Sequence, residues 1–340
     1  MDSCPICGSP EIATSIATRD RFVGKPGDFR VVECASCGLA RLSPRPHPDV
    51  LAQHYPESYP MYANTSLEPR NENPLSATIR AFIRNTVDRV HVAPATQHRP
   101  SSLEQRIYDK YRERVLRGFE RHIPRHVGSG KVLDVGCGNP TFLLLVRRLG
   151  WEVAGLEPNQ YACERANEVL GSRAVLHGKL SDHLHERGSF DYVHLSHVLE
   201  HLDDPISELG ECFQLLKPGG IIYVETPNFA SFGRKTFGTY WLNMDSPRHL
   251  FLFTPSTLAR VMRERGFALE SMTTYTWDNS TYPWEYTFEL EDKCGELLPD
   301  RPRVRPSDSA RESQQAYKAA IQNDSLCGDV LCLWGRRPIA

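Results

Sequence analysis

The stretch KVLDVGCGNPTFLLLVRRLG at 131–150 constrains the fold most, because a short buried strand runs through a glycine turn directly into a helix. Glycines at such a turn let the backbone approach a ligand at the helix N-terminus. A second strand, WEVAGLE, ends in Glu157, which lies 23 residues after Asp134. Nucleotide-binding folds place a ribose-binding carboxylate at about this position. The pattern predicts a nucleotide-type α/β fold.

The residues around the turn indicate which ligand it binds. Asp134 precedes the first glycine, Gly136, by two positions. A carboxylate beside the turn would repel the pyrophosphate that dinucleotide sites bind through G-x-G-x-x-G. It suits a ligand that carries an amino group and a sulfonium and no phosphate. We therefore expect S-adenosylmethionine, and the same argument disfavours an NAD-dependent oxidoreductase.

Two cysteine pairs stand near the N-terminus, CPICG at 4–8 and CASCG at 34–38. The glycine after each pair lets the backbone turn so that amides point at the thiolates. Four thiolates at this spacing suit tetrahedral zinc better than a disulfide or a redox C-x-x-C motif. We predict a closed structural zinc site formed by Cys4, Cys7, Cys34 and Cys37.

Composition narrows the class of protein. Hydrophobic residues make up 40% and charged residues 24% of the 340 residues, as in an ordinary globular protein. The formal net charge of −2 argues against a broad nucleic-acid footprint. The N-terminus has no signal-peptide pattern, and no apolar run approaches a membrane span. We expect a cytoplasmic protein without membrane association.

The chain divides by pattern into four segments. Residues 1–47 form the predicted zinc ribbon, and 48–127 form a helical linker or lid. Residues 128–275 alternate apolar runs with helical patterns, which is typical of a parallel α/β sheet. Residues 276–340 hold an aromatic stretch, a polar helix and a last strand, and we expect them to complete the core and the acceptor pocket.

Several motifs in this order resemble the class I S-adenosylmethionine-dependent methyltransferases, in particular a bacterial branch with an N-terminal zinc ribbon. They are CPICGS, CASCGLARLSPRP, LDVGCG, GLEPN, FDYVHLSHVLEHLDDP, LLKPGGIIYVETPN and PRHLFLFTPSTLARVMRERGF. The resemblance covers about residues 1–270 and departs at 139–140, where Asn-Pro replaces a small residue and glycine. It implies a Rossmann-like seven-stranded sheet whose last strand is antiparallel, and DVLCLWGRR fits that strand.

The resemblance also implies which residues bind the methyl donor. They are Asp134, Gly136, Gly138, Glu157, Leu180, Ser181 and Ser196. The first three would hold the methionine part and Glu157 the ribose hydroxyls. Leu180 and Ser181, with neighbouring backbone, would frame the adenine, and Ser196 would lie near the reactive methyl.

Residues 197–201 read H-x-x-E-H, which is also the spacing of one class of zinc peptidase. In a peptidase the motif lies within a long helix. Here it follows a strand directly, and the Asp-Asp-Pro sequence at 203–205 interrupts any helix. The sequence therefore favours a turn that lines a pocket over a peptidase site.

One helical turn would place His197, Glu200 and His201 on one face, and His249 follows downstream. The arrangement is similar to the metal-dependent enzymes that methylate small RNAs at the terminal ribose and to ubiquinone-pathway O-methyltransferases. Both use E-x-x-E-H, with His197 here in place of the first Glu. Three interpretations stay open: a second divalent metal, Zn²⁺, Fe²⁺ or Mn²⁺, on these four residues; His197 or His249 as a general base without metal; or structural hydrogen bonds alone.

Together these features predict a methyltransferase that methylates a hydroxyl of a small acceptor, such as a sugar, a glycan or a natural-product intermediate. Two alternatives remain at this stage. One is C-methylation of a keto-sugar or similar carbon acid. The other is a nucleic-acid adaptor that binds through the ribbon and keeps a degenerate core.

Overall fold

The computed structural model describes residues 3–55, 74–91, 98–116, 119–124, 130–276 and 306–339. The chain forms two compact units. Unit 1 comprises Met1–Tyr59, Leu195–Gln214 and Ile221–Ala340, and unit 2 comprises Pro60–His194 and Leu215–Gly220. Each unit is therefore assembled from segments that are separated in the sequence.

The helices of the described residues are mostly short. The α-helices are α1 (Pro48–Ala52), α2 (Pro74–His91), α4 (Ser102–Val115), α5 (Thr141–Arg148), α6 (Gln160–Leu170), α7 (Pro205–Leu215), α8 (Phe232–Phe237), α9 (Pro255–Glu264) and α11 (Pro306–Asn323). The 3₁₀ helices are η2 (Phe119–Arg121), η3 (Leu180–Glu186), η4 (Leu199–His201), η5 (Gly238–Tyr240) and η6 (Leu242–Met244).

A seven-stranded mixed sheet has the strand order β10-β11-β8-β7-β4-β5-β6. Its strands are β4 (Lys131–Val135), β5 (Glu152–Glu157), β6 (Val175–His177), β7 (Phe190–Ser196), β8 (Leu216–Pro227), β10 (Ala268–Tyr275) and β11 (Val330–Arg336). Strands β4, β5 and β6 are parallel, whereas β11 is antiparallel to β8 and β10. The predicted seven-stranded sheet with an antiparallel last strand is confirmed.

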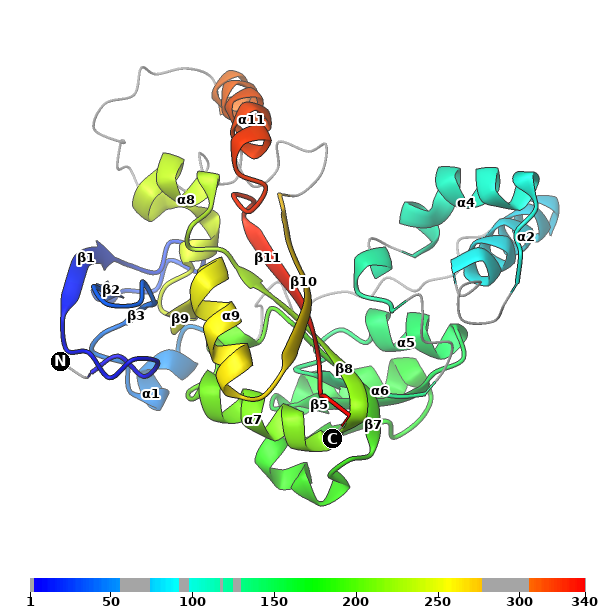
Figure 1. The fold of residues 1–340 in the computed structure, drawn as a ribbon, viewed down its shortest axis with the longest axis horizontal. Helices are drawn as coiled ribbons and strands as arrows, with labels where there is room; N and C mark the ends of the chain where they lie inside the picture. The colour runs from blue at the N-terminus through cyan, green and yellow to red at the C-terminus, as the bar shows by residue number, and fades with distance from the viewer. Residues whose placement is uncertain are drawn as a thin grey trace. The chain divides into compact units, whose positions relative to one another are not determined.

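In unit 2, helix α5 packs closely on β5 because Gly155 leaves room for it (Figure 1). A Cβ atom at Gly155 would lie 2.9 Å from both Leu143 Cδ1 and Val175 Cγ2. Real Cβ atoms do not approach other atoms this closely, so the strand accepts only glycine at this position without a shift of its neighbours. This packing fixes the glycine turn between β4 and α5.

In unit 1, a second sheet contains four antiparallel strands in the order β1-β2-β3-β9 (Figure 1). They are β1 (Ile12–Thr18), β2 (Phe29–Cys34), β3 (Ala40–Leu42) and β9 (Phe251–Leu252). Three strands come from the predicted ribbon, and the fourth comes from a segment about 200 residues further along the chain. A division at residue 47 does not anticipate this strand, and the four predicted segment boundaries stay a prediction.

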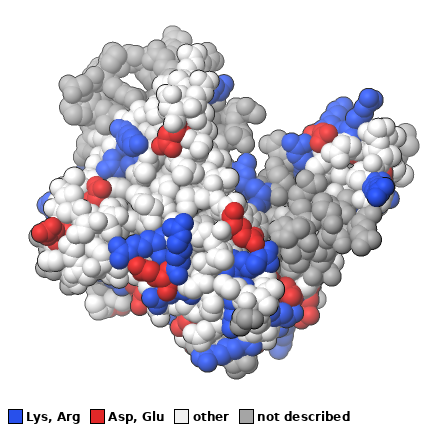
Figure 2. Space-filling view, viewed as in Figure 1, with Lys and Arg blue, Asp and Glu red and all other residues white. Residues whose placement is uncertain are grey.

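The surface of the described residues carries charges of both signs. On the face that Figure 2 shows, Lys and Arg side chains are interspersed with Asp and Glu. Nucleic-acid-binding surfaces instead gather basic residues on one face. Among the described helices, none has the length and apolar character that crossing a bilayer requires.

The close approach of α5 to β5 makes a stability prediction. Gly155→Ala should destabilise the fold by about 1–3 kcal/mol, because the added methyl group overpacks the contact with Leu143 and Val175. Gly210→Ala, in the interior of α7, is the matched control. Its Cβ would only meet the flexible side chain of Arg265 at 3.6 Å.

The control should be neutral or stabilising by up to about 1 kcal/mol, because alanine favours helix over glycine. Thermal unfolding followed by circular dichroism measures both variants. Equal unfolding midpoint temperatures for the two variants would show that α5 does not pack tightly against Gly155.

Candidate active site

The glycine turn after β4 adopts a conformation that glycine favours. Gly136 and Gly138 have φ angles of +63° and +41°, in the left-handed region. The Gly138 N–H donates to Oε2 of Glu157 at 2.9 Å, and the Cys137 N–H donates to the Leu156 carbonyl at 3.1 Å. The turn that follows β4 is thus bonded to the end of β5.

Glu157 is a buried carboxylate, 6% exposed, at the end of β5. Its second oxygen, Oε1, accepts the Asn159 N–H at 2.9 Å. Burial, together with the nearby charge of Asp134, raises the pKa of Glu157, although the two backbone N–H groups oppose the shift. A carboxylate oxygen has more than one acceptor site, so both oxygens can still accept hydroxyl groups.

Asp134 is 4% exposed and its carboxylate is held by histidines that the sequence analysis did not single out. Oδ1 of Asp134 lies 2.7 Å from Nδ1 of His194, and Nε2 of His194 lies 3.0 Å from Nδ1 of His122. The Phe142 ring stacks on His194 with centroids 3.8 Å apart. This chain of contacts fixes the orientation of the Asp134 carboxylate.

The other predicted donor-binding residues differ in exposure. Leu180 is 1% exposed at the start of η3, whereas Ser181 beside it is exposed. Ser196, the last residue of β7, donates its hydroxyl to Glu225 Oε1 at 3.1 Å. The serine hydroxyl is therefore oriented by a carboxylate near the C-terminal end of β8.

His197 does not lie within the helical turn that the sequence predicts. It precedes η4 and has a φ of +55°, which few side chains adopt without strain. Its Nδ1 lies 3.1 Å from Glu200 Oε1, and its Nε2 lies 3.4 Å from Glu225 Oε1. Burial disfavours the imidazolium, but the two carboxylates outweigh it and raise the pKa of His197 to about 10.

Glu200 is completely buried, and it forms the other half of this ion pair. Its Oε2 accepts the Thr226 hydroxyl at 2.9 Å. Burial would raise the pKa of Glu200, yet the bond to His197 and the charges of nearby imidazoles lower it to about 2. Glu200 is therefore an ionised, hydrogen-bonded carboxylate with fixed geometry.

His201 and His249 each point Nδ1 at a backbone carbonyl. The distance from His201 Nδ1 to the Arg248 carbonyl is 3.0 Å, and from His249 Nδ1 to the Asn243 carbonyl it is 2.8 Å. A carbonyl oxygen only accepts, so both Nδ1 atoms carry a proton, and each ring in its neutral form has its lone pair on Nε2. Burial and the charge of His249 lower the pKa of His201 to about 4, which favours its neutral form.

Potential metal-ligand atoms of Glu200, His201 and His249 all lie within 4.8 Å of one another. The His201 and His249 ring centroids are 4.7 Å apart. His197 does not belong to this group, because its imidazole is engaged by Glu200 and Glu225. Of the four residues that the sequence predicts to converge, these three form the compact set.

The four cysteines of the ribbon converge as predicted. Sγ of Cys4 lies 3.5 Å from that of Cys37, and Sγ of Cys7 lies 3.4 Å from that of Cys34. Tetrahedral zinc with Zn–S bonds of about 2.3 Å separates its sulfurs by about 3.8 Å, so the group fits that ion with a small adjustment. Burial opposes ionisation of Cys34, but the N–H groups of Cys37 and Ser36 lower the pKa of its thiol to about 7.

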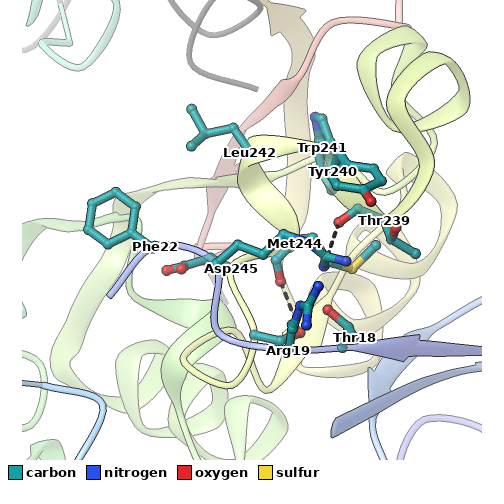
Figure 3. A pocket seen from close by; sticks show the side chains of 11 residues that line it. Thr18, Arg19, Phe22, Thr239, Tyr240, Trp241, Leu242, Met244 and Asp245 are labelled. Atoms are coloured by element: carbon teal, nitrogen blue, oxygen red, sulfur yellow. Dashed lines mark hydrogen bonds between the residues drawn. The ribbon is translucent and has the colours of Figure 1, made fainter. Parts of the chain in front are cut away.

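Among the described residues, unit 1 includes a smaller and a larger cavity. The smaller, shown in Figure 3, has a volume of ≈ 20 Å³, and its lining residues are Thr18, Arg19, Arg21, Phe22, Thr239, Tyr240, Trp241, Leu242, Met244, Asp245 and Ser246. This volume suits a water-sized group and not a whole acceptor. The larger has a volume of ≈ 260 Å³, and its lining residues are Arg45, Pro46, Pro48, Leu51, Ala52, Tyr55, Asp203 and Leu250.

Tyr55 connects the larger cavity to the histidine pair. Its hydroxyl lies 3.1 Å from Nδ1 of His201, and its ring meets the His201 ring edge to face. The aromatic stretch at 277–288, which the sequence places in the acceptor region, lies outside the described residues. Tyr55 therefore both lines this cavity and contacts His201.

Comparison with known proteins identifies the family. Residues 105–272 match the family described as "Methyltransferase domain". The ubiquinone biosynthesis O-methyltransferase of Thiobacillus denitrificans is 30% identical over 201 residues, which cover 55% of this chain and 83% of the relative. The chain belongs to the class I S-adenosylmethionine-dependent methyltransferases. The ubiquinone biosynthesis O-methyltransferase of Aromatoleum aromaticum is 31% identical over 157 residues, covering 42% of this chain and 67% of the relative.

A solved structure is similar over a larger part of the methyltransferase. An S-adenosylmethionine-dependent methyltransferase from Archaeoglobus fulgidus aligns with 67% of this chain and 96% of its own, at 23% identity and a TM-score of 0.45. Members of this family take their methyl group from S-adenosylmethionine. The positive-φ glycine turn and the two buried carboxylates, Asp134 and Glu157, are groups that fit this cationic, ribose-containing donor.

The cysteine group makes a prediction about metal content. A thiol-specific mercurial should release about one zinc ion per chain from the wild-type methyltransferase. Cys34→Ser should lack this zinc, because a serine hydroxyl replaces one thiolate ligand. Cys163→Ser, at a buried cysteine in unit 2, is the control and should keep its zinc. Elemental analysis after gel filtration measures both. Equal zinc in the two variants would contradict the four-cysteine site.

Proposed function

We propose that the protein transfers the methyl group of S-adenosylmethionine to a hydroxyl oxygen of a small acceptor, and that His201 and His249 act on that hydroxyl. The two relatives are named as O-methyltransferases, which supports oxygen as the methylated atom. The single structural observation that carries the proposal is the group of Glu200, His201 and His249, in which each imidazole donates Nδ1–H to a backbone carbonyl and so has only Nε2 left to accept a proton or bind a metal.

The reaction explains why lone pairs are required. The hydroxyl oxygen forms a bond to the methyl carbon as the carbon–sulfur bond breaks, and S-adenosylhomocysteine leaves with the electron pair of that bond. The acceptor proton must pass to a base, because a neutral hydroxyl is a poor nucleophile. His249 or His201 can accept it at Nε2. His197 is held as a cation by two carboxylates, so it is a weaker candidate for the base.

The same residues suit a divalent metal. Two imidazoles and one carboxylate, with both Nδ1–H groups bonded to carbonyls, form a donor set typical of Zn²⁺ or Fe²⁺. Bound there, a metal would supply Lewis-acid stabilisation of the deprotonated acceptor oxygen. As a general base or as a metal ligand, His249 would act through the lone pair on Nε2.

For the donor, we propose the roles that the family resemblance gives. Asp134 would bind the methionine amino group, with Gly136 and Gly138 allowing close approach of the backbone. Glu157 would bind the ribose hydroxyls with the remaining acceptor sites of its two oxygens. The His194 contact supports this role for Asp134, because an oriented carboxylate binds a cation without losing further conformational freedom.

Three further residues complete the proposed donor site. The exposed hydroxyl of Ser181 and the buried side chain of Leu180 would border the adenine. The Ser196 hydroxyl, which donates to Glu225, would lie near the transferred methyl. These roles rest on the positions of the residues at η3 and at the end of β7.

The acceptor is proposed to occupy the larger cavity of unit 1. Its volume of ≈ 260 Å³ suits a single substituted ring, since a cavity of about 150 Å³ already holds benzene. Proline and leucine side chains would pack on the ring faces, and Tyr55 would orient a hydroxyl toward His201. A ring of a sugar or of a natural-product intermediate fits this description.

His249→Ala tests the proposed function. Turnover should fall by about 10²- to 10⁴-fold, as for the loss of a general base, while adenosylhomocysteine affinity stays within about twofold. Sugars and phenols are first screened for transfer of a radiolabelled methyl group, and the best acceptor is used for kinetics. The product should show the NMR signal of a methyl ether.

His98→Ala is the control for that experiment, because His98 pairs with Glu104 and has no proposed role in methyl transfer. It should retain turnover. A product with a new carbon–methyl bond would exclude O-methylation. Full activity of His249→Ala would show that His249 has no role in methyl transfer.

Asp134→Asn tests the donor site. The variant keeps the shape of the side chain and loses its charge, so adenosylhomocysteine should bind at least about tenfold more weakly, equivalent to about 1.4 kcal/mol. 5′-Methylthioadenosine lacks the methionine amino group and is the matched control ligand. Its affinity should change by less than about twofold in calorimetry. Equal losses for both ligands would show that Asp134 does not act on the amino group.

A further inference from the structure

We infer that the N-terminal ribbon positions the His201–His249 pair, so that Asp20 and Arg248 are positioning residues of the active site. The inference rests on the proposed function and deepens it, because it assigns a task in methyl transfer to the N-terminal ribbon. It rests on contacts within unit 1 alone.

The segment that carries His249 is part of the ribbon sheet. Strand β9 begins two residues after His249, and it pairs with β3 through Arg41 opposite Phe251 and Ala40 opposite Leu252. The Leu42 N–H also donates to the Leu250 carbonyl at 3.0 Å. The backbone on the C-terminal side of His249 is therefore held by β3.

The residue before His249 is held by the ribbon as well. Arg248 is completely buried, and its Nη1 and Nη2 donate to the two carboxylate oxygens of Asp20 at 3.0 and 2.9 Å. Asp20 follows β1 directly in the β1–β2 connection. Its Oδ2 also lies 2.7 Å from Nδ1 of His54, and Arg248 Nη1 donates to the His54 carbonyl at 3.1 Å.

The remaining contacts of Arg248 keep it in one position. Its Nε donates to both carboxylate oxygens of Asp245 at 3.0 Å. A guanidinium that binds two carboxylates through several N–H groups has little freedom to move. The Arg248 backbone is consequently fixed by its own side chain.

The Arg248 backbone in turn orients the histidines. Its carbonyl accepts the Nδ1–H of His201, the contact that leaves the His201 Nε2 lone pair available. The next residue is His249, and the Leu250 N–H donates to the Glu200 carbonyl at 2.7 Å. A shift of Arg248 would therefore change the tautomer of His201 and the direction of His249 together.

The cysteines belong to the same chain of contacts. Cys34 ends β2, Cys37 lies in the turn that follows, and β3 begins at Ala40. A zinc ion on the four cysteines would keep this turn closed, and β3 is the strand that pairs with β9. The ribbon thus holds the backbone of residues 248–252 in place.

Asp20→Asn tests the inference in the 340-residue chain loaded with about one equivalent of zinc. Long-range ¹H–¹⁵N spectra of labelled histidines report the tautomer of each imidazole, and His201→Gln and His249→Gln assign the two signals. The wild type should show Nδ1-protonated rings for both. In Asp20→Asn the His201 signal should move to a mixture of tautomers, while adenosylhomocysteine affinity stays within about twofold.

Asp28→Asn is the matched control, because Asp28 is exposed in the same β1–β2 connection. It should leave both signals unchanged. Asp20→Glu is measured as well, because it keeps the negative charge in case loss of charge prevents folding; its longer side chain should also disturb the His201 signal. Unchanged tautomers in both folded Asp20 variants would overturn the inference. So would a parallel loss of adenosylhomocysteine binding, which would mark the ribbon as a general stabiliser.

The two levels of the proposal can fail separately. If the tautomers change in the Asp20 variants but His249→Ala keeps full turnover, the ribbon positions the histidines. In that case the histidines have no role in methyl transfer. If His249→Ala is inactive and the Asp20 variants keep wild-type spectra, the proposed function stands without help from the ribbon.

Discussion

The ion pair between Asp20 and Arg248 is the interaction on which the arrangement of unit 1 depends. Both side chains are completely buried. The free energy needed to remove two charges from water is larger than the stabilisation that an exposed ion pair provides. The cost is offset because the guanidinium also bonds to Asp245 and to the His54 carbonyl. Such a network tolerates one geometry, since any displacement leaves a buried charge without a partner.

That single geometry matters because the histidines of the site differ in protonation state. His197 stands between two carboxylates and is a cation, whereas His201 faces a carbonyl and is neutral. Two histidines within five residues, His197 and His201, thus serve two different purposes. The His197 imidazolium neutralises the buried charge of Glu200, and the neutral His201 ring keeps a lone pair for a proton or a metal.

Local patterns in the sequence predicted a large part of this molecule. The glycines at 136 and 138 indicated a strand–turn–helix, and the two cysteine pairs indicated a four-sulfur group, because each depends on a few neighbouring residues. The motifs also predicted the methyltransferase family and the antiparallel last strand. The helical spacing of 197–201 was a weaker guide: His197 has a left-handed backbone and lies outside η4. Its bond to Glu225, a residue of β8, competes with the helical turn.

The sequence by itself determined the turn chemistry, the thiolate group and the polar residues available for catalysis, since those follow from residue type and short spacing. Only the tertiary structure decided which of them meet. Nothing in the spacing of Asp20 and Arg248, or of His122, His194 and Asp134, marks them as partners, because they approach through folding of distant segments. The pairing of β9 with β3 is likewise a long-range contact between two short strands. Two- and three-residue strands carry too little pattern to be recognised alone, and burial of their backbone groups against each other settles the pairing.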